Sequence, residues 1–188
     1  MRGQQDKFGT PVEMKLKSEW FRHAYYVYLV SVVDAREGRR FIYVGQTGDR
    51  AHLMARSPFY RMSGHFQQGR STQNQVVKGL RDRYEIDDLD QKRLVAKLLD
   101  MDIAYRAYPL AEFEFGVSRE KHQELRRCTE RVETALIDIL RENLEWDVLN
   151  KKRGPEPGAG DLAVGEAIFE DWRGSLGSSM SDATTNKF

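Results

Sequence analysis

Residues 25–45 read YYVYLVSVVDAREGRRFIYVG, two apolar runs separated by a polar turn. The first run, 25–33, consists almost entirely of aromatic and β-branched residues and is typical of a buried strand. The second run, 41–45, ends at a glycine. Two such runs around a glycine-containing turn predict an antiparallel hairpin with a rather long loop. Tyr43 lies inside the second run, where a valine would pack as well, and this raises the question of a function for its hydroxyl group.

The composition excludes several classes of protein. No run approaches the roughly 18 uninterrupted apolar residues of a membrane span, and the N-terminus lacks the apolar centre of a signal peptide. A single cysteine, Cys128, excludes an internal disulfide framework and fits a reducing cytoplasm. With only four scattered histidines besides it, a structural zinc site is not expected. We therefore expect a cytoplasmic protein, and its 188 residues suffice for one domain with a proper core.

The net charge of +1 is unevenly distributed. Residues 154–188 hold six acidic and two basic residues, a net charge of −4, which leaves +5 on residues 1–153. A basic body with an acidic tail is compatible with a polyanionic partner, although many domains of this charge bind no nucleic acid. The tail is rich in glycine and serine. Only residues 162–172 have the pattern of a short amphipathic helix, and we expect the rest to be mobile.

A helix with clear end signals follows the hairpin. Ser57 is a suitable N-cap, Pro58 suits the first helical position, and Gly69 marks the expected end. Arg61 and His65 are four residues apart and therefore project from one helical face. The apolar stripe of this helix lies roughly opposite and comprises Phe59, Met62 and Phe66. We therefore expect Arg61 and His65 to point away from the core.

The remaining elements are predicted from periodicity. Residues 70–104 look like an inserted segment of one or two helices. Alternating apolar and acidic residues through Phe115 then predict a strand with one solvated face, and Pro109 makes it an edge strand or delays its start. Residues 119–142 give the clearest helix, and Glu133 lies at the margin of its apolar stripe.

Six polar residues stand out in this framework: Tyr28, Tyr43, Arg61, His65, Glu133 and Asn150. Each alone has an ordinary explanation, because tyrosines pack in strands and arginines and histidines occupy surfaces. Together they are what phosphodiester hydrolysis requires. One group must activate water, a cation must hold the phosphate, and a carboxylate must place a divalent metal against the leaving oxygen.

In order and spacing, these residues resemble the GIY-YIG nuclease superfamily. Tyr43-Val44-Gly45, followed by Gln46-Thr47, is similar to the second half of the motif that names the family. Tyr26-Val27-Tyr28 stands where the first half is expected, with Tyr26 in place of the glycine. Arg61-x-x-x-His65 matches the arginine and the histidine or tyrosine of the family, and Glu133 and Asn150 match its glutamate and asparagine. The resemblance covers roughly residues 24–151.

The resemblance implies a small α+β domain, a mixed α/β arrangement with a three-stranded central sheet flanked by helices. This domain would span residues 24–153, with 70–104 as an insertion, after an N-terminal extension of residues 1–23. Glycine at position 45 would let a DNA backbone approach closely.

The resemblance also implies a role for each residue. Tyr28 and Tyr43 would orient or deprotonate the attacking water, although a phenol titrates near pH 10 and needs nearby cations to lower that pKa. Arg61 would hold the phosphate, and His65 would assist proton transfer or bind phosphate. Glu133 would be the only protein ligand of one Mg²⁺ or Mn²⁺ ion. Asn150 would brace the site by hydrogen bonding.

The implied function is that of a divalent-metal-dependent DNA endonuclease, with a restriction-type or phage-type enzyme favoured. The alternatives are a structure-specific repair or recombination nuclease and a catalytically inactive DNA-binding module on the same fold. Cutting both strands would favour a homodimer. Arg50 and Arg56 are rivals of Arg61 for the phosphate, and only the spacing to His65 favours Arg61. Tyr26 is likewise a rival of Tyr28.

Overall fold

The computed structural model describes residues 13–67, 74–143 and 145–182. Its centre is a four-stranded sheet in the order β3-β1-β2-β4. The strands are β1 (Ala24–Asp34), β2 (Arg39–Gln46), β3 (Met101–Glu112) and β4 (Asp147–Val148). β1 pairs antiparallel with β2 and β3, which confirms the predicted hairpin, and β4 pairs parallel with β2. The α+β class is confirmed. The expected count of three strands is wrong, because the backbone after the long helix pairs with Phe41 and Ile42 and adds a fourth.

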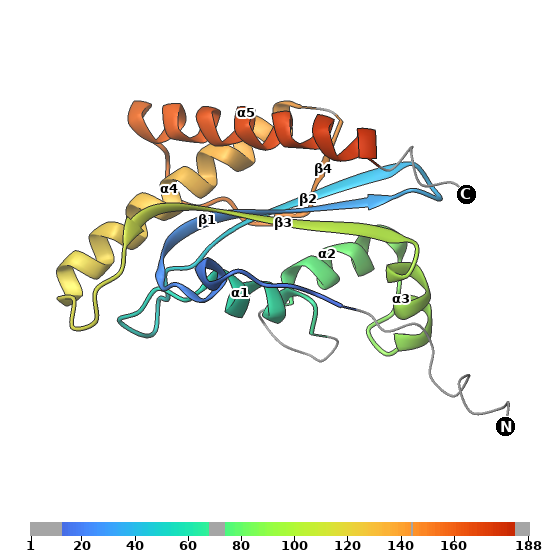
Figure 1. Cartoon of the computed structure of the whole chain (residues 1–188), viewed down its shortest axis with the longest axis horizontal. Coiled ribbons are helices and arrows are strands. Elements are labelled where there is room, and N and C mark those ends of the chain that lie inside the picture. Colours follow the sequence, from blue (N-terminus) through green and yellow to red (C-terminus); the bar gives the residue numbers. More distant parts are fainter. Residues whose placement is uncertain (1–12, 68–73, 144, 183–188) are drawn as a thin grey trace, which may run out of the picture.

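Helices cover both faces of this sheet (Figure 1). One face carries α1 (Pro58–His65), α2 (Gln75–Tyr84) and α3 (Gln91–Leu98), and the other carries α4 (Arg119–Glu142) and α5 (Ala159–Asp182). A short 3-10 helix, η1 (Ser18–Phe21), precedes β1 and contacts α1. Because β1 is central and covered from both sides, side chains on both of its faces are buried, which explains its unbroken apolar run.

The two faces of the hairpin differ in the residues they carry and in the helices they contact. Val27, Leu29 and Val44 belong to an apolar core shared with α4 and α5. Tyr28 and Tyr43 lie on the opposite face, packed among residues of the α1–α2 side. The tyrosines of the sequence motif therefore face the three short helices and not the two long ones.

The C-terminal helix is longer than the sequence predicts. α5 runs from Ala159 to Asp182, whereas only 162–172 was expected to be helical and the residues around it mobile. Its apolar residues bury against α4 and the sheet, and Trp172 packs edge-on against Trp146. The close approach uses a glycine, since a Cβ at Gly165 would contact Ala135 on α4. Tertiary packing thus overrides the low helix propensity of glycine and serine. Residues 183–188 lie outside the described ranges.

The boundary between the insertion and β3 also differs from the prediction. Helix α3 ends at Leu98, and β3 begins at Met101, inside the segment expected to be helical up to 104. β3 is an edge strand, as Pro109 suggested, and its register with β1 shifts beside that proline. Phe115, expected in the strand, lies beyond it in the loop before α4. The predicted helix end at Gly69 falls outside the described residues.

The turn end of the hairpin contains a buried ion pair. Asp34 is fully buried and accepts hydrogen bonds from the backbone N–H groups of Arg36 and Glu37. Its other carboxylate oxygen accepts from the Tyr84 hydroxyl at 2.6 Å and lies 2.7 Å from Lys97 Nζ. These contacts attach α2 and α3 to the hairpin. None of the helices within the described ranges is long and apolar enough to cross a membrane.

Candidate functional site

Tyr28 is the centre of a polar cluster at the other end of the hairpin. It is fully buried and lies directly across from Gly45 in the β1–β2 register. A Cβ at position 45 would overlap the ring and the hydroxyl of Tyr28. Gly45 therefore makes room for the tyrosine of the neighbouring strand, and the expectation that it makes room for a DNA backbone is wrong. Tyr28, and not its rival Tyr26, is the residue that contacts the other site residues.

Helix α1 supplies two of those contacts. The hydroxyl of Tyr28 lies 2.7 Å from His65 Nε2, and Arg61 Nε donates to the Tyr28 oxygen at 3.3 Å. His65 is only 1% exposed, so the expectation that Arg61 and His65 point away from the core is wrong. The helix instead turns this polar face to Tyr28. Of its stripe residues, Phe59 packs against Phe21 of η1, whereas Phe66 packs against the buried apolar residues of the α1–α2 side, as expected.

The direction of the hydrogen bonds follows from the donors available. A guanidinium can only donate, so the Tyr28 oxygen accepts from Arg61 and the Tyr28 hydroxyl gives its own hydrogen to His65 Nε2. A neutral His65 then carries its proton on Nδ1, which is buried and has no hydrogen-bond partner among the described residues. The result is a directed chain from Arg61 through Tyr28 to His65.

The pKa values of these hydrogen-bonded residues disagree with the expectation that nearby cations lower the pKa of a tyrosine. Burial raises the pKa of Tyr28, although the charge of Arg61 lowers it in part. Burial likewise raises the pKa of Tyr43 well above its usual value. Neither phenol therefore has the lowered pKa that a tyrosine base needs. Burial, and then the charge of Arg61, lower the pKa of His65 to about 3, so its imidazole is neutral at neutral pH and its Nε2 can accept the hydrogen bond from Tyr28.

Two further tyrosines surround Tyr28. Tyr43 lies with its ring centroid 4.8 Å from that of His65. Tyr105 of β3 stacks on Tyr28 with ring centroids 4.9 Å apart, and its hydroxyl is buried without a hydrogen-bond partner in the described ranges. The sequence alone did not identify Tyr105, because its position beside Tyr28 depends on the pairing of β1 with β3.

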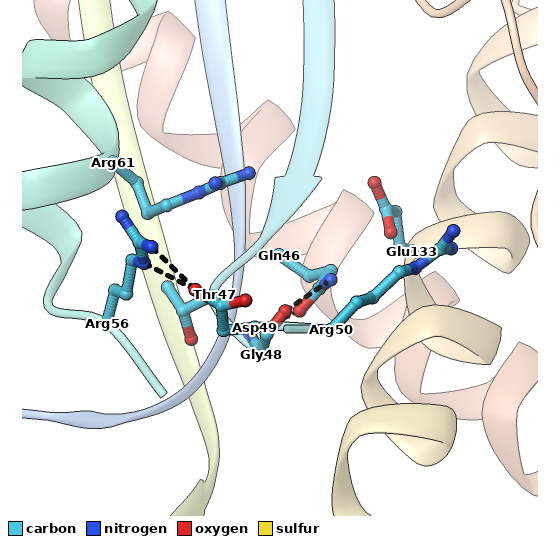
Figure 2. Close-up of a pocket in the computed structure, with 8 residues that line it drawn as sticks. All are labelled: Gln46, Thr47, Gly48, Asp49, Arg50, Arg56, Arg61 and Glu133. Atoms are coloured by element: carbon cyan, nitrogen blue, oxygen red, sulfur yellow. Dashed lines mark hydrogen bonds and ion pairs between the residues drawn. The ribbon is translucent and has the colours of Figure 1, made fainter. Parts of the chain in front are cut away.

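A pocket of about 330 Å³ opens beside this cluster. It is lined by residues 46–50 together with Arg56, Arg61 and Glu133. In Figure 2, Arg61 enters from the α1 side and Glu133 from the α4 side, with the 46–50 segment between them. The pocket thus brings residues from two helices and one loop to a common space.

Glu133 faces this pocket without a hydrogen bond or ion pair to any other described residue. Burial, and then the charge of Glu130, raise its pKa to about 8, while Arg61 and Arg50 act in the opposite direction. At neutral pH the group is therefore mostly protonated, and a bound divalent cation would favour its carboxylate form. No group of three His, Cys, Asp or Glu side chains within the described ranges could hold a metal. An ion at Glu133 would take most of its ligands from water and substrate, as Mg²⁺ commonly does.

The three arginines of the pocket differ in how their charge is balanced. Arg56 donates twice to one carboxylate oxygen of Asp49, at 2.9 and 2.6 Å. Arg50 donates to Glu130, which also accepts from Arg126 on α4. Arg61 has no carboxylate within ion-pair distance in the described part of the chain. This uncompensated charge, together with the contact to Tyr28, favours Arg61 over its rivals as the anion-binding arginine.

Asn150 supports strand β2 of the hairpin through hydrogen bonds and is not among the residues that line the pocket. Its Oδ1 accepts from the backbone N–H of Val44 at 2.9 Å, and its Nδ2 donates to the Val44 carbonyl at 2.8 Å. The side chain thereby imitates one more residue of a strand beside the Tyr43-Val44-Gly45 segment. This agrees with the bracing role expected for it.

A second brace, which sequence reasoning missed, holds the pocket loop. The hydroxyl of Tyr25 lies 2.7 Å from His122 Nδ1, and His122 Nε2 donates to the Asp49 carbonyl at 2.9 Å. The Asp49 side chain in turn accepts from the backbone N–H groups of Ala51 and His52. No sequence signal joins Tyr25 to His122, because the two are 97 residues apart.

Compared with protein-family models, curated proteins and solved structures, the chain gives no match. Its function therefore has to be inferred from the geometry of the site.

Proposed function

We propose that the protein is a divalent-metal-dependent DNA endonuclease of the GIY-YIG type, of the restriction or phage kind. One observation carries the proposal. Arg61 and Glu133, neither of which has an ion-pair partner among the described residues, line the same pocket beside a buried Tyr28–His65 hydrogen bond. An uncompensated cation suits a phosphate, and an uncompensated carboxylate suits a metal ion.

The residues divide the hydrolysis of a phosphodiester between them. Arg61 holds the phosphate through its free N–H donors and stabilises the charge that develops on it. Glu133 would hold one Mg²⁺ or Mn²⁺ ion. When bound, such an ion withdraws charge from the phosphate and from the leaving oxygen. Tyr43, whose ring packs against His65, helps to orient the attacking water.

Proton transfer runs through Tyr28. The attacking water gives a proton to the Tyr28 oxygen while the Tyr28 hydroxyl passes its own proton to His65 Nε2. The new P–O bond forms as the bond to the leaving oxygen breaks, and that oxygen takes a proton from solvent. Phosphate binding assists this transfer, because its negative charge offsets Arg61, the second cause of the low His65 pKa.

Incubation with plasmid and phage DNA tests the proposal. The wild-type protein should cut in Mg²⁺ or Mn²⁺ and not in EDTA. Glu133→Ala should lose at least about 10³-fold in rate, whereas Glu166→Ala, at an exposed position of α5, should cut normally. Discrete bands would support a restriction-type enzyme, and cleavage confined to branched DNA would identify a repair or recombination nuclease.

Two results would contradict the assignment. DNA binding without cleavage under any metal would leave only the inactive binding module. Normal cutting by Arg61→Ala together with loss in Arg56→Ala would show that the wrong arginine was chosen.

A further inference from the structure

Arg50 lies in the pocket but takes no part in the reaction described above. Its side chain is 76% exposed, far more than that of Arg56 at 17%. In Figure 2 the Arg50 side chain extends toward the Glu133 side of the pocket, whereas Arg61 reaches in from α1. The pocket therefore presents two separate guanidinium groups on opposite sides.

The charge of Arg50 is only partly balanced. Glu130 Oε1 accepts from Arg50 Nε and Nη2, at 3.0 and 2.8 Å, and also from Arg126 Nη1 at 2.6 Å. One carboxylate thus serves two guanidinium groups, so Arg50 shares its only ion-pair partner among the described residues with Arg126. Glu130 is largely buried, so it holds Arg50 from the protein side, and the solvent-facing side of the guanidinium stays accessible.

The loop that carries Arg50 is held in place before any ligand arrives. The Asp49 backbone is fixed by His122, and the Asp49 N–H donates to the Met54 carbonyl at 3.0 Å. The Arg56 N–H donates to the Thr47 carbonyl at 3.0 Å and closes the loop onto the end of β2. Arg50 is therefore presented by a preorganised element, which lowers the entropic cost of binding.

We propose that Arg50 forms a second phosphate subsite, which binds the phosphate next to the scissile one on the same DNA strand. The inference rests on the proposed nuclease function, and it assigns the two accessible arginines to two consecutive phosphates. Arg61 holds the phosphate that is cut, and Arg50 holds its neighbour and sets the register of the strand. Because Glu130 keeps Arg126 as a partner, Arg50 can turn its free donors to a phosphate without leaving a buried carboxylate unpaired.

Binding of a 20-base-pair duplex that the enzyme cuts, measured in Ca²⁺ over a range of salt concentrations, tests the subsite. Arg50→Gln should weaken binding about tenfold and lower the log–log salt slope by about 1, as expected for one lost phosphate contact. Arg50→Lys keeps the charge but loses the bidentate guanidinium geometry, so its affinity should lie between those of wild type and Arg50→Gln. Arg36→Gln, an exposed arginine paired with Asp100 near the hairpin turn, is the matched control and should change neither quantity.

Neutral phosphates then locate the contact. A methylphosphonate at the phosphate beside the scissile one should weaken wild-type binding about tenfold but should not weaken Arg50→Gln further. Additive losses would place Arg50 elsewhere on the DNA and overturn the subsite. Unchanged affinity and salt slope in Arg50→Gln would also overturn it, while leaving the nuclease function intact. Failure of the wild-type protein to bind any DNA would overturn both.

Discussion

The two ends of the β1–β2 hairpin carry two buried polar clusters, one in which the charges are paired and one in which they are not. At the turn end, Asp34 is matched by Lys97, by the Tyr84 hydroxyl and by two backbone N–H groups. At the other end, Arg61 has no carboxylate partner and His65 Nδ1 has no acceptor within the described ranges. We call the Asp34 cluster closed, because its charges have partners, and the Tyr28 cluster open, because some of its groups lack them.

The difference distinguishes buried polar groups that stabilise the fold from buried polar groups that are available for function. Buried polar groups normally find partners, since an unsatisfied group costs free energy. The Asp34 cluster follows this rule and fixes α2 and α3 to the hairpin. In the Tyr28 cluster, His65 Nδ1 and the Tyr105 hydroxyl are buried without partners among the described residues. Arg61 borders the pocket, where a substrate phosphate can supply the partner that its charge lacks. Variants at the two ends should therefore affect different properties.

Asp34→Asn should cause the largest change. It leaves Lys97 with only the half-exposed Glu37 as an ionic partner, so the loss in the free energy of unfolding should approach the roughly 3–5 kcal/mol that breaking a buried pair typically costs. Urea unfolding followed by circular dichroism measures the loss. Asp102→Asn, at an exposed carboxylate of β3, should change the same quantity by less than about 0.5 kcal/mol. Reduced DNA cleavage per folded molecule in Asp34→Asn would break the comparison between the two ends.

Tyr28→Phe should produce the converse result. It removes the hydroxyl that joins Arg61 to His65, and loss of this proton path should slow cleavage by about 10²–10³-fold. The equivalent activation free energy is about 2.7–4 kcal/mol. Single-turnover cleavage in Mg²⁺ is the measurement, and Tyr26→Phe, at a buried tyrosine on the same strand, should cut within about twofold of wild type. A slow Tyr26→Phe beside a normal Tyr28→Phe would reverse the assignment of the motif tyrosine.

Gly45→Ala should have a smaller effect that links stability to the site. The added methyl group overlaps Tyr28, and such overpacking costs about 1–3 kcal/mol of unfolding free energy. In a Tyr28→Ala background the cost should largely disappear, because the clashing ring is gone. A thermal unfolding cycle of the four proteins measures this coupling. Gly174→Ala on α5, where a Cβ meets open space, is the control and should not destabilise.

The pH dependence of stability should give the smallest effect and should come from the closed end. Burial opposes the charged form of Asp34, but hydrogen bonds from Lys97 and Tyr84 outweigh it and lower its pKa to about 2. This contribution is complete above the unfolded pKa near 4 and is lost as the pH falls toward 2. At pH 3 about 1 kcal/mol of it should be gone. Urea unfolding at pH 7 and pH 3 should show this loss in wild type, and equal loss in Asp34→Asn would assign it to other groups.

The sequence predicts the hairpin, the Ser57 cap and the long helix of Glu133, because each is written in local patterns. It does not predict which face of α1 meets the sheet. A helical wheel predicts that the apolar stripe of Phe59 faces the sheet. The sheet instead presents Tyr28 as a polar partner for Arg61 and His65, and the position of Tyr28 is known only once the strands are paired. The full length of α5 depends on packing against α4, which local propensity does not contain. The brace from Tyr25 through His122 joins distant positions for the same reason.

The two hydrogen bonds between Asn150 and Val44 join positions 106 residues apart. During synthesis, the hairpin leaves the ribosome long before the residue that completes its outer edge. A nascent chain therefore holds both motif tyrosines for most of its elongation with the last support of β2 still missing. If the protein cuts DNA as proposed, this late closure postpones full activity until almost the whole domain has been made.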